Sequence, residues 1–391
     1  MNTFTDRWRQ LDWDDIGLRI NSKTPADVER ALNARQPTRE DMMALLSPAA
    51  SRYLEPMAQR AKRLTRQRFG NTVSFYVPLY LSNLCANDCT YCGFSMSNHI
   101  KRKTLNENEI ARECAAIRAM GFEHLLLVTG EHQTKVGMDY FRRHIPAIRR
   151  QFASLQMEVQ PLSEAQYGEL KTLGLDGVLV YQETYHEAVY ARHHLKGKKQ
   201  DFFWRLETPD RLGRAGIDKI GLGALTGLSD NWRVDNFMVA EHLLWLQQHY
   251  WQSRYSISFP RLRPCAGGSR RRRSWMNASW CRPFARFVCW HRKWSYRYRP
   301  GNPPHFAIAL FRWPLITSVL FQKPSQAAMP MITPSWSSLR RTITVARKRL
   351  PGRLANKDCS QCGKTGIAGW DAPRSRVEKS CKPMKCLRGV T

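Results

Sequence analysis

The sequence predicts an α/β fold in which parallel strands and helices alternate to form a barrel of the TIM type. Six short apolar segments, rich in β-branched and aromatic residues, alternate with longer segments of helical period. This alternation is typical of a parallel sheet, and eight such units would close a barrel. The length of 391 residues and the apolar fraction of 42% allow a sizeable core and exclude wholesale disorder. The mean hydropathy of −0.51 argues against a polytopic membrane protein.

Helices are expected first, over residues 1–70. The segment 51–69 carries apolar residues near the helical period, and Gly70 is expected to end it. The alternation then begins at 73–81, which is predicted as a strand despite Pro78. Five further strands are expected at 125–128, 155–160, 178–181, 217–222 and 255–259. Helices are expected at 106–120, 138–152, 163–173 and 235–250, with shorter helical pieces between 181 and 214. Functional side chains should follow these strands, because active sites of such barrels lie at the carboxyl ends.

The composition of the chain changes abruptly after Gly268. Residues 1–268 contain 36 basic and 29 acidic side chains, whereas residues 269–391 contain 26 basic and 3 acidic ones. The net charge of +30 therefore belongs mostly to the second part, which also holds 6 of the 11 cysteines and 7 of the 13 tryptophans. We divide the chain into an N-terminal helical segment (1–70), a barrel core of about six βα units (71–268) and a basic tail (269–391).

A change of reading frame explains the tail. When residues 288–304 are back-translated with free codon choice and read from the third base of each codon, they can give LLAPEMELSLSTRESP, which has balanced charge. Segments 356–374 and 269–280 can give similar text in the same phase. Three pieces in one phase favour an out-of-frame tail that is disordered or misfolded. The alternative is a genuine basic, tryptophan-rich domain, which would suit an anionic partner such as nucleic acid.

Cysteine usage in the first part indicates a reducing compartment. Residues 1–30 carry Asp and Arg throughout and lack the apolar run of a signal peptide. The cysteines of residues 1–268 are therefore expected to be thiols or metal ligands of a cytoplasmic protein, not disulfides.

The loop directly after the first predicted strand carries three cysteines within eight residues, in the order Cys85-Ala-Asn-Asp-Cys89-Thr-Tyr-Cys92. Three thiolates at this spacing can bind three irons of a [4Fe–4S] cluster, and the fourth iron is then open to a small molecule. Zinc is the competing interpretation, although a structural zinc site normally has four protein ligands.

This CxxxCxxC motif, with an aromatic residue before its last cysteine, resembles that of the radical S-adenosylmethionine (SAM) superfamily. The blocks VPLYLSNLCANDCTYCGFSMSN, LLLVTGEHQTKVG and SISFPRLRPCAGG resemble the 2-iminoacetate synthase family of bacterial thiamine biosynthesis. The resemblance covers about residues 1–268. It implies a lyase that uses a [4Fe–4S] cluster and SAM to cleave the Cα–Cβ bond of L-tyrosine to 2-iminoacetate and 4-cresol. It also implies a flavodoxin-type electron donor and cooperation with thiazole synthase, and neither a membrane nor a nucleic acid as partner.

The resemblance gives roles to five residues around the cysteine loop. It implies that Cys85, Cys89 and Cys92 bind the cluster. Tyr91 matches the aromatic position that packs near the adenine of SAM, and Glu131 matches the carboxylate that accepts hydrogen bonds from the SAM ammonium group.

Five further candidates follow the later strands. Tyr181 and Glu183 end the fourth strand, where polar groups reach toward SAM or the substrate. Gly221 and Gly223 lie at the end of the fifth, where a backbone without side chains can approach adenine. Arg261 follows the sixth and is our candidate for gripping the tyrosine carboxylate, since a guanidinium binds a carboxylate through two parallel hydrogen bonds.

Two alternatives stay open. A hydrogenase-maturation relative also cleaves tyrosine, and release of cyanide or carbon monoxide would favour that reaction. A genuine tail would instead suggest a basic nucleic-acid-binding protein. If the tail is out of frame, the last two βα units are missing and a strand edge is exposed. We then expect this exact chain to be poorly soluble and nearly inactive.

Overall fold

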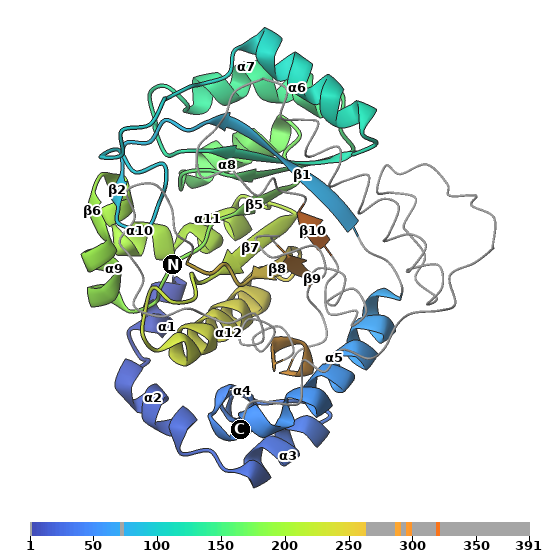
Figure 1. Cartoon of the computed structure of the whole chain (residues 1–391), viewed down its shortest axis with the longest axis vertical. Coiled ribbons are helices and arrows are strands. Elements are labelled where there is room, and N and C mark those ends of the chain that lie inside the picture. The colour runs from blue at the N-terminus through green and yellow to red at the C-terminus, as the bar shows by residue number, and fades with distance from the viewer. Residues whose placement is uncertain (1, 71–73, 263–285, 291–294, 299–317, 321–391) are drawn as a thin grey trace, which may run out of the picture.

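The computed structural model describes residues 2–70, 74–262, 286–290, 295–298 and 318–320. It confirms the predicted class, since a closed barrel of parallel strands is surrounded by helices (Figure 1). Residues 263–268 of the predicted barrel core and most of the basic tail lie outside the described residues. No helix in the described part is long and apolar enough to cross a membrane.

The chain begins with the helices that the sequence predicts. They are α1 (Phe4–Trp8), α2 (Trp13–Asn21), α3 (Pro25–Asn33), α4 (Arg39–Leu46), the 3-10 turn η1 (Ala49–Tyr53) and α5 (Leu54–Phe69). Thr24 and Thr38 start α3 and α4 with capping boxes, in which the threonine and an aspartate three residues later satisfy each other's backbone amides. Gly70 ends α5 with φ of 59°, a conformation that costs glycine little.

The barrel contains eight strands, each paired in parallel with its neighbours. The six strands predicted from the sequence are confirmed as β1 (Ser74–Ser82), β3 (His124–Thr129), β4 (Ser154–Glu158), β5 (Gly177–Leu179), β7 (Lys219–Gly223) and β8 (Arg254–Ser258). Around the barrel the order is β1, β3, β4, β5, β7, β8, β9 and β10, after which β10 pairs with β1.

Two strands were not predicted, and both come from the tail. They are β9 (Ser295–Tyr298) and β10 (Ser318–Leu320), which pair with β8, with each other and with β1. The open strand edge that we expected is therefore closed in the structure. The physical reason is that ladder hydrogen bonds join backbone groups, so a short extended segment can pair with a free edge whatever its side chains. Residues 286–290 form a helical turn as well, and its Trp290 donates from Nε1 to the carbonyl of Thr38 at 2.7 Å.

Helices cover the outside of the barrel. They are α6 (Glu107–Ala119), α7 (Met138–Arg149), α8 (Glu164–Thr172), α9 (Glu187–His193), α10 (Phe202–Leu206), α11 (Thr208–Arg214) and α12 (Trp232–His249). Figure 1 shows α6, α7 and α8 on one side and α12 with the N-terminal helices on the other. The helices predicted at 106–120, 138–152, 163–173 and 235–250 are confirmed as α6, α7, α8 and α12, with ends that differ by a few residues.

Side chains of each strand alternate between two cores. The outward ones join the large core between barrel and helices, as Leu125 and Leu127 of β3 do. The inward ones form a small separate cluster inside the barrel, made of Tyr76, Leu126, Leu179 and Tyr181 with Val128 against them. The barrel interior is thus packed and apolar, and polar chemistry is confined to the loops at its mouth.

Candidate functional site

The three cysteines lie on one loop at the carboxyl end of β1. Cys85 and Cys92 are partly buried, and Cys89 is buried within the two-residue strand β2 (Asp88–Cys89). This strand pairs antiparallel with β6 (His194–Lys196), so that Cys89 lies opposite His194. The three thiols are free. The loop therefore presents three unoxidised thiols beside a small two-stranded ribbon.

The three cysteine thiols can serve a multi-iron cluster, in which each thiolate binds a different iron. Among the described residues, no three His, Cys, Asp or Glu side chains converge closely enough to hold one metal ion. Burial raises the pKa of Cys89 to about 12 and also raises that of Cys92. Both are protonated at neutral pH without iron, and iron binding must release those protons.

A glycine brings the second strand end against this loop. A Cβ at Gly130 would lie 2.3 Å from the carbonyl oxygen of Leu84 and 3.1 Å from Cβ of Cys85. The next residue, Glu131, accepts from the backbone amide of Ala86 at 2.8 Å through its own carbonyl oxygen. Only glycine permits this approach, and it places the Glu131 carboxylate beside the cysteines.

The Glu131 carboxylate is mostly buried, with a side-chain exposure of 16%, and each of its oxygens accepts a hydrogen bond. Nδ2 of Asn87 donates to it at 2.7 Å, and Nη1 of Arg205 donates at 3.0 Å. Burial alone would raise the pKa of Glu131, but the charges of Arg205 and Lys199 and these hydrogen bonds outweigh it and hold the pKa below its usual value. Glu131 is therefore ionised and suited to bind a cationic group.

Glu183 lies across from Glu131 in an unusual backbone conformation. Its φ of 72° is the single positive value among the described non-glycine residues. Strain of this kind costs about 1–3 kcal/mol and marks functional sites. Nζ of Lys199 donates to its carboxylate at 2.7 Å, and Nη2 of Arg205 lies 3.6 Å away. Arg205 therefore joins Glu131 and Glu183, and its Nε also donates to the carbonyl of Tyr181 at 2.7 Å.

Tyr91 packs on the ribbon rather than standing free. Nδ1 of His194 donates to the carbonyl of Tyr190 at 2.7 Å, so Nε2 accepts from the Tyr91 hydroxyl at 2.7 Å. Lys199 lies 5.7 Å from the centre of the Tyr91 ring. The structure thus fixes this ring between the cysteine loop and the Lys199 ammonium group, and the adenine contact stays a prediction.

The two candidate glycines of β7 make room inside the barrel. A Cβ at Gly221 would lie 2.6 Å from Cγ of Leu179, and one at Gly223 would lie 3.0 Å from Cδ1 of Tyr181. Tyr181 in turn donates from its hydroxyl to Oγ of Ser258 at 3.2 Å. Gly221 thus makes room for Leu179 of β5, and Gly223 permits the close approach of the Ser258 carbonyl oxygen of β8, which a Cβ would meet at 2.4 Å. The approach to adenine stays a prediction.

Arg261 lies on the loop after β8, next to the loop after β7. Its backbone bridges to Thr226, whose amide donates to the carbonyl of Pro260 at 2.8 Å. The side chain is partly buried. The structure thus brings Arg261 to the same end of the barrel as Glu183, whose bridge partner Ala224 lies two residues before Thr226.

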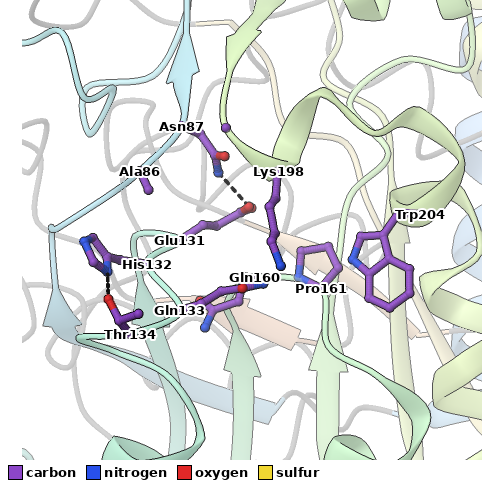
Figure 2. Close-up of a pocket in the computed structure, with 11 residues that line it drawn as sticks. Ala86, Asn87, Glu131, His132, Gln133, Thr134, Gln160, Pro161, Lys198 and Trp204 are labelled. Atoms are coloured by element: carbon purple, nitrogen blue, oxygen red, sulfur yellow. Dashed lines mark hydrogen bonds between the residues drawn. The ribbon is translucent and has the colours of Figure 1, made fainter.

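A pocket of about 270 Å³ opens beside Glu131 at the barrel mouth (Figure 2). Asn87 and His132 lie on one side of it, and Lys198 and Trp204 on another. Three buried side-chain oxygens near these strand ends have no hydrogen-bond partner among the described residues, namely those of Thr129, Gln160 and Gln182. Unpaired buried polar atoms are costly, and of these three residues Gln160 lines the pocket.

Three functional candidates had no signal in the sequence pattern. Arg205, Lys199 and Asn87 come from α10, from the 3-10 turn η2 (Lys198–Gln200) and from the cysteine loop. Arg205 is 74 residues from Glu131 along the chain, so no local spacing could reveal their contact.

Known proteins similar to this chain agree with the geometry. Residues 79–237 match the family model "Radical SAM superfamily". The 2-iminoacetate synthase of Escherichia coli is 87% identical over 268 residues, which are 68% of this chain and 71% of that protein. The Salmonella typhimurium enzyme of the same name is 84% identical over the same shares. A crystal structure of HydG, "A maturase of the [FeFe]-hydrogenase", matches this chain with a TM-score of 0.70 and 26% identity. The match covers 81% of this chain and 70% of the HydG chain. The chain belongs to the radical SAM superfamily and, within it, to the 2-iminoacetate synthase family.

Proposed function

We propose that this protein is a radical SAM lyase that cleaves the Cα–Cβ bond of L-tyrosine to 2-iminoacetate and 4-cresol. The 2-iminoacetate is used to build the thiazole ring of thiamine. The observation that carries the proposal is 87% identity to a curated 2-iminoacetate synthase over a region as long as the part before the composition break. The three-thiol loop and the ionised carboxylate beside it support the same reaction.

The cofactors supply the radical chemistry, and the chain holds them. When bound, the reduced [4Fe–4S] cluster and SAM supply a 5′-deoxyadenosyl radical. Cys85, Cys89 and Cys92 hold the cluster. Glu131 accepts hydrogen bonds from the SAM ammonium group, because its carboxylate is ionised and lies against the cysteine loop.

The barrel mouth binds tyrosine and excludes water. Arg261 grips the tyrosine carboxylate, and Tyr181 and Glu183 line the site from the end of β5. The apolar interior below them closes the site from the far end. Exclusion of water and reactive neighbours protects a primary carbon radical from side reactions.

Product analysis tests this function against its alternative. The cluster is reconstituted under anaerobic conditions in the chain with its reading frame restored, and SAM, L-tyrosine and a one-electron reductant are added. We expect 4-cresol and 5′-deoxyadenosine by chromatography and mass spectrometry. The variant with Cys85, Cys89 and Cys92 all replaced by alanine should give neither product. Cyanide or carbon monoxide formed with 4-cresol would instead support the hydrogenase-maturation reaction.

We also propose that residues 269–391 are translated out of frame. The match to the Escherichia coli relative spans 268 residues and leaves more than a quarter of that protein unmatched, which supports a break near Gly268. DNA sequencing across codons 262–275 tests the proposal. A missing base relative to the frame of the alternative text supports it, whereas an open frame as written with no alternative contradicts it. Salt-sensitive duplex binding that disappears without residues 269–391 would support a genuine basic domain.

A frame-restored chain separates the two proposals. Inserting the missing base gives a protein whose first 268 residues are unchanged. We expect the restored chain to cleave tyrosine and the chain as written to have little activity. We further propose a cytoplasmic location, a flavodoxin-type donor and thiazole synthase as the acceptor of the unstable imine. Coupled thiazole formation in a mixture of the purified proteins tests these partners.

A further inference from the structure

A single arginine that the proposed function does not use is bonded to both ends of the cysteine loop. Nη1 of Arg102 donates to the carbonyl oxygens of Asn83 and Phe94, both at 2.8 Å. Nη2 donates to the carbonyl oxygens of Ser95 at 2.6 Å and Asn98 at 3.1 Å. One planar guanidinium thus holds four backbone carbonyls, a number that its fork of five N–H donors can satisfy.

The four carbonyls bracket all three cysteines. Asn83 lies two residues before Cys85, and Phe94 lies two residues after Cys92. The side chain of Asn83 adds a second tie, because its Oδ1 accepts from the amide of Lys103 at 2.7 Å and its Nδ2 donates to the carbonyl of Lys101 at 2.8 Å. The segment that carries Arg102 therefore runs along the entrance and the exit of the loop.

Two of the four acceptor residues also hold the cysteines themselves. Oγ of Ser95 accepts from the amide of Cys89 at 2.9 Å. Nδ2 of Asn98 donates to the carbonyl of Cys92 at 3.0 Å. Arg102 is thus one further hydrogen bond away from two of the three ligand-bearing residues.

The charge of Arg102 is not neutralised by a carboxylate. It forms no ion pair with any acidic side chain of the described residues, although its guanidinium is partly buried. A partly buried cation without an acidic partner favours negative charge nearby, and a cluster with three thiolates supplies it.

We propose that Arg102 is a positioning residue for the cluster, which keeps the cysteine loop in its binding conformation before iron arrives and raises the reduction potential of the bound cluster. The inference rests on the proposed cluster at Cys85, Cys89 and Cys92. A pre-formed loop loses less chain entropy on binding. A fixed positive charge and hydrogen bonds to the loop favour the reduced, more negative cluster.

The test compares two substitutions of Arg102 with a matched control. Arg102→Gln removes the charge and most donors, whereas Arg102→Lys keeps the charge without the fork. Arg149 is the control, because its Nη1 also donates to two carbonyls away from the cysteines, those of Phe152 at 3.3 Å and Ala153 at 2.9 Å, besides its ion pair with Asp176 at 3.3 Å. Arg149→Gln should therefore disturb a loop without touching cluster chemistry.

Three readouts are taken on the full chain. Hydrogen exchange of the cluster-free protein reports the loop, and amides of residues 89–95 should exchange at least tenfold faster in Arg102→Gln. Iron and sulfide retained after anaerobic reconstitution and desalting should fall severalfold in both Arg102 variants. A redox titration followed by electron paramagnetic resonance should show a lower cluster potential in Arg102→Gln than in Arg102→Lys.

Each outcome decides the proposal. It is overturned if Arg102→Gln retains iron and keeps its potential like the parent, or if Arg149→Gln shows the same losses. Far-UV circular dichroism identifies a variant that fails to fold, and Arg102→Lys then carries the comparison. A frame-restored parent chain that binds no cluster would instead refute the proposed function.

Discussion

Removal of Arg205 should lower stability strongly, because it takes one partner from a buried charge network. Its side chain is 6% exposed, and it bonds Glu131 at 3.0 Å and the carbonyl of Tyr181 at 2.7 Å, with Glu183 at 3.6 Å. Breaking a buried ion pair by removing one partner costs about 3–5 kcal/mol, because the other charge stays buried. In Arg205→Gln we therefore expect the free energy of unfolding to fall by about 3–5 kcal/mol at pH 7.5.

The pH dependence of this loss follows from Glu131. In the parent, the pKa of Glu131 in the folded state lies below its usual value of about 4.5, so its ionised form stabilises the folded state above that pH. This stabilisation is lost as the pH falls through the pKa of the folded state. Without Arg205 the pKa of Glu131 rises, because burial is then opposed only by Lys199 and Asn87, and less stabilisation remains to be lost as the pH falls. Both effects make the difference between parent and variant smaller at pH 5 than at pH 7.5.

Urea unfolding of the cluster-free chain, followed by tryptophan fluorescence at both pH values, measures this difference. The double variant with Glu131→Gln and Arg205→Gln is the control, and it should recover part of the loss because no lone charge stays buried. A loss below about 1 kcal/mol, or a loss of equal size at both pH values, would refute the assignment of a buried charge network.

Three further predictions concern the cysteine loop and a buried acid. Gly130→Ala should lower the free energy of unfolding by about 1–3 kcal/mol and reduce iron retention, because the added Cβ would lie 2.3 Å from the loop backbone. Gly168→Ala is the control, since its added Cβ would meet nothing within 4 Å, and it should be neutral or stabilising. Cys89→Ser should abolish the visible absorbance of the reconstituted cluster, and Cys114→Ser, a buried helix thiol, should leave the iron content unchanged. Burial raises the pKa of Asp235 to about 7. As the pH rises from about 4 to 7, the free energy of unfolding should therefore fall by up to about 1.4 kcal/mol per pH unit. Asp235→Asn should lack this slope in thermal melts at about pH 5 and 7.

The strands could be predicted because local patterns determine them. β1 and β3 are runs of apolar residues bounded by turn residues, and each is buried on both sides. The ribbon of β2 and β6 escaped prediction because strands of two and three residues have no measurable period. β9 also escaped, since its placement depends on pairing with β8 rather than on its own sequence.

The site was predictable where one motif carries the chemistry. The spacing of Cys85, Cys89 and Cys92 indicates a cluster by itself. The contacts of Arg205 and Arg102 were not predictable, because they join groups whose proximity exists only in the folded chain. Gly221 and Gly223 of β7 are a third case. Their place at the end of a strand was predicted from the sequence, and the structure adds that they allow close packing there.

The most direct test of the central claim is a labelled turnover experiment with the frame-restored chain. The reconstituted protein is given SAM, a one-electron reductant and L-tyrosine labelled with carbon-13 in its ring, and the products are quantified by mass spectrometry. We expect ring-labelled 4-cresol that depends on SAM and on Cys85, Cys89 and Cys92, with no cyanide or carbon monoxide. A chain that binds the cluster and cleaves SAM but releases no labelled 4-cresol would contradict this claim.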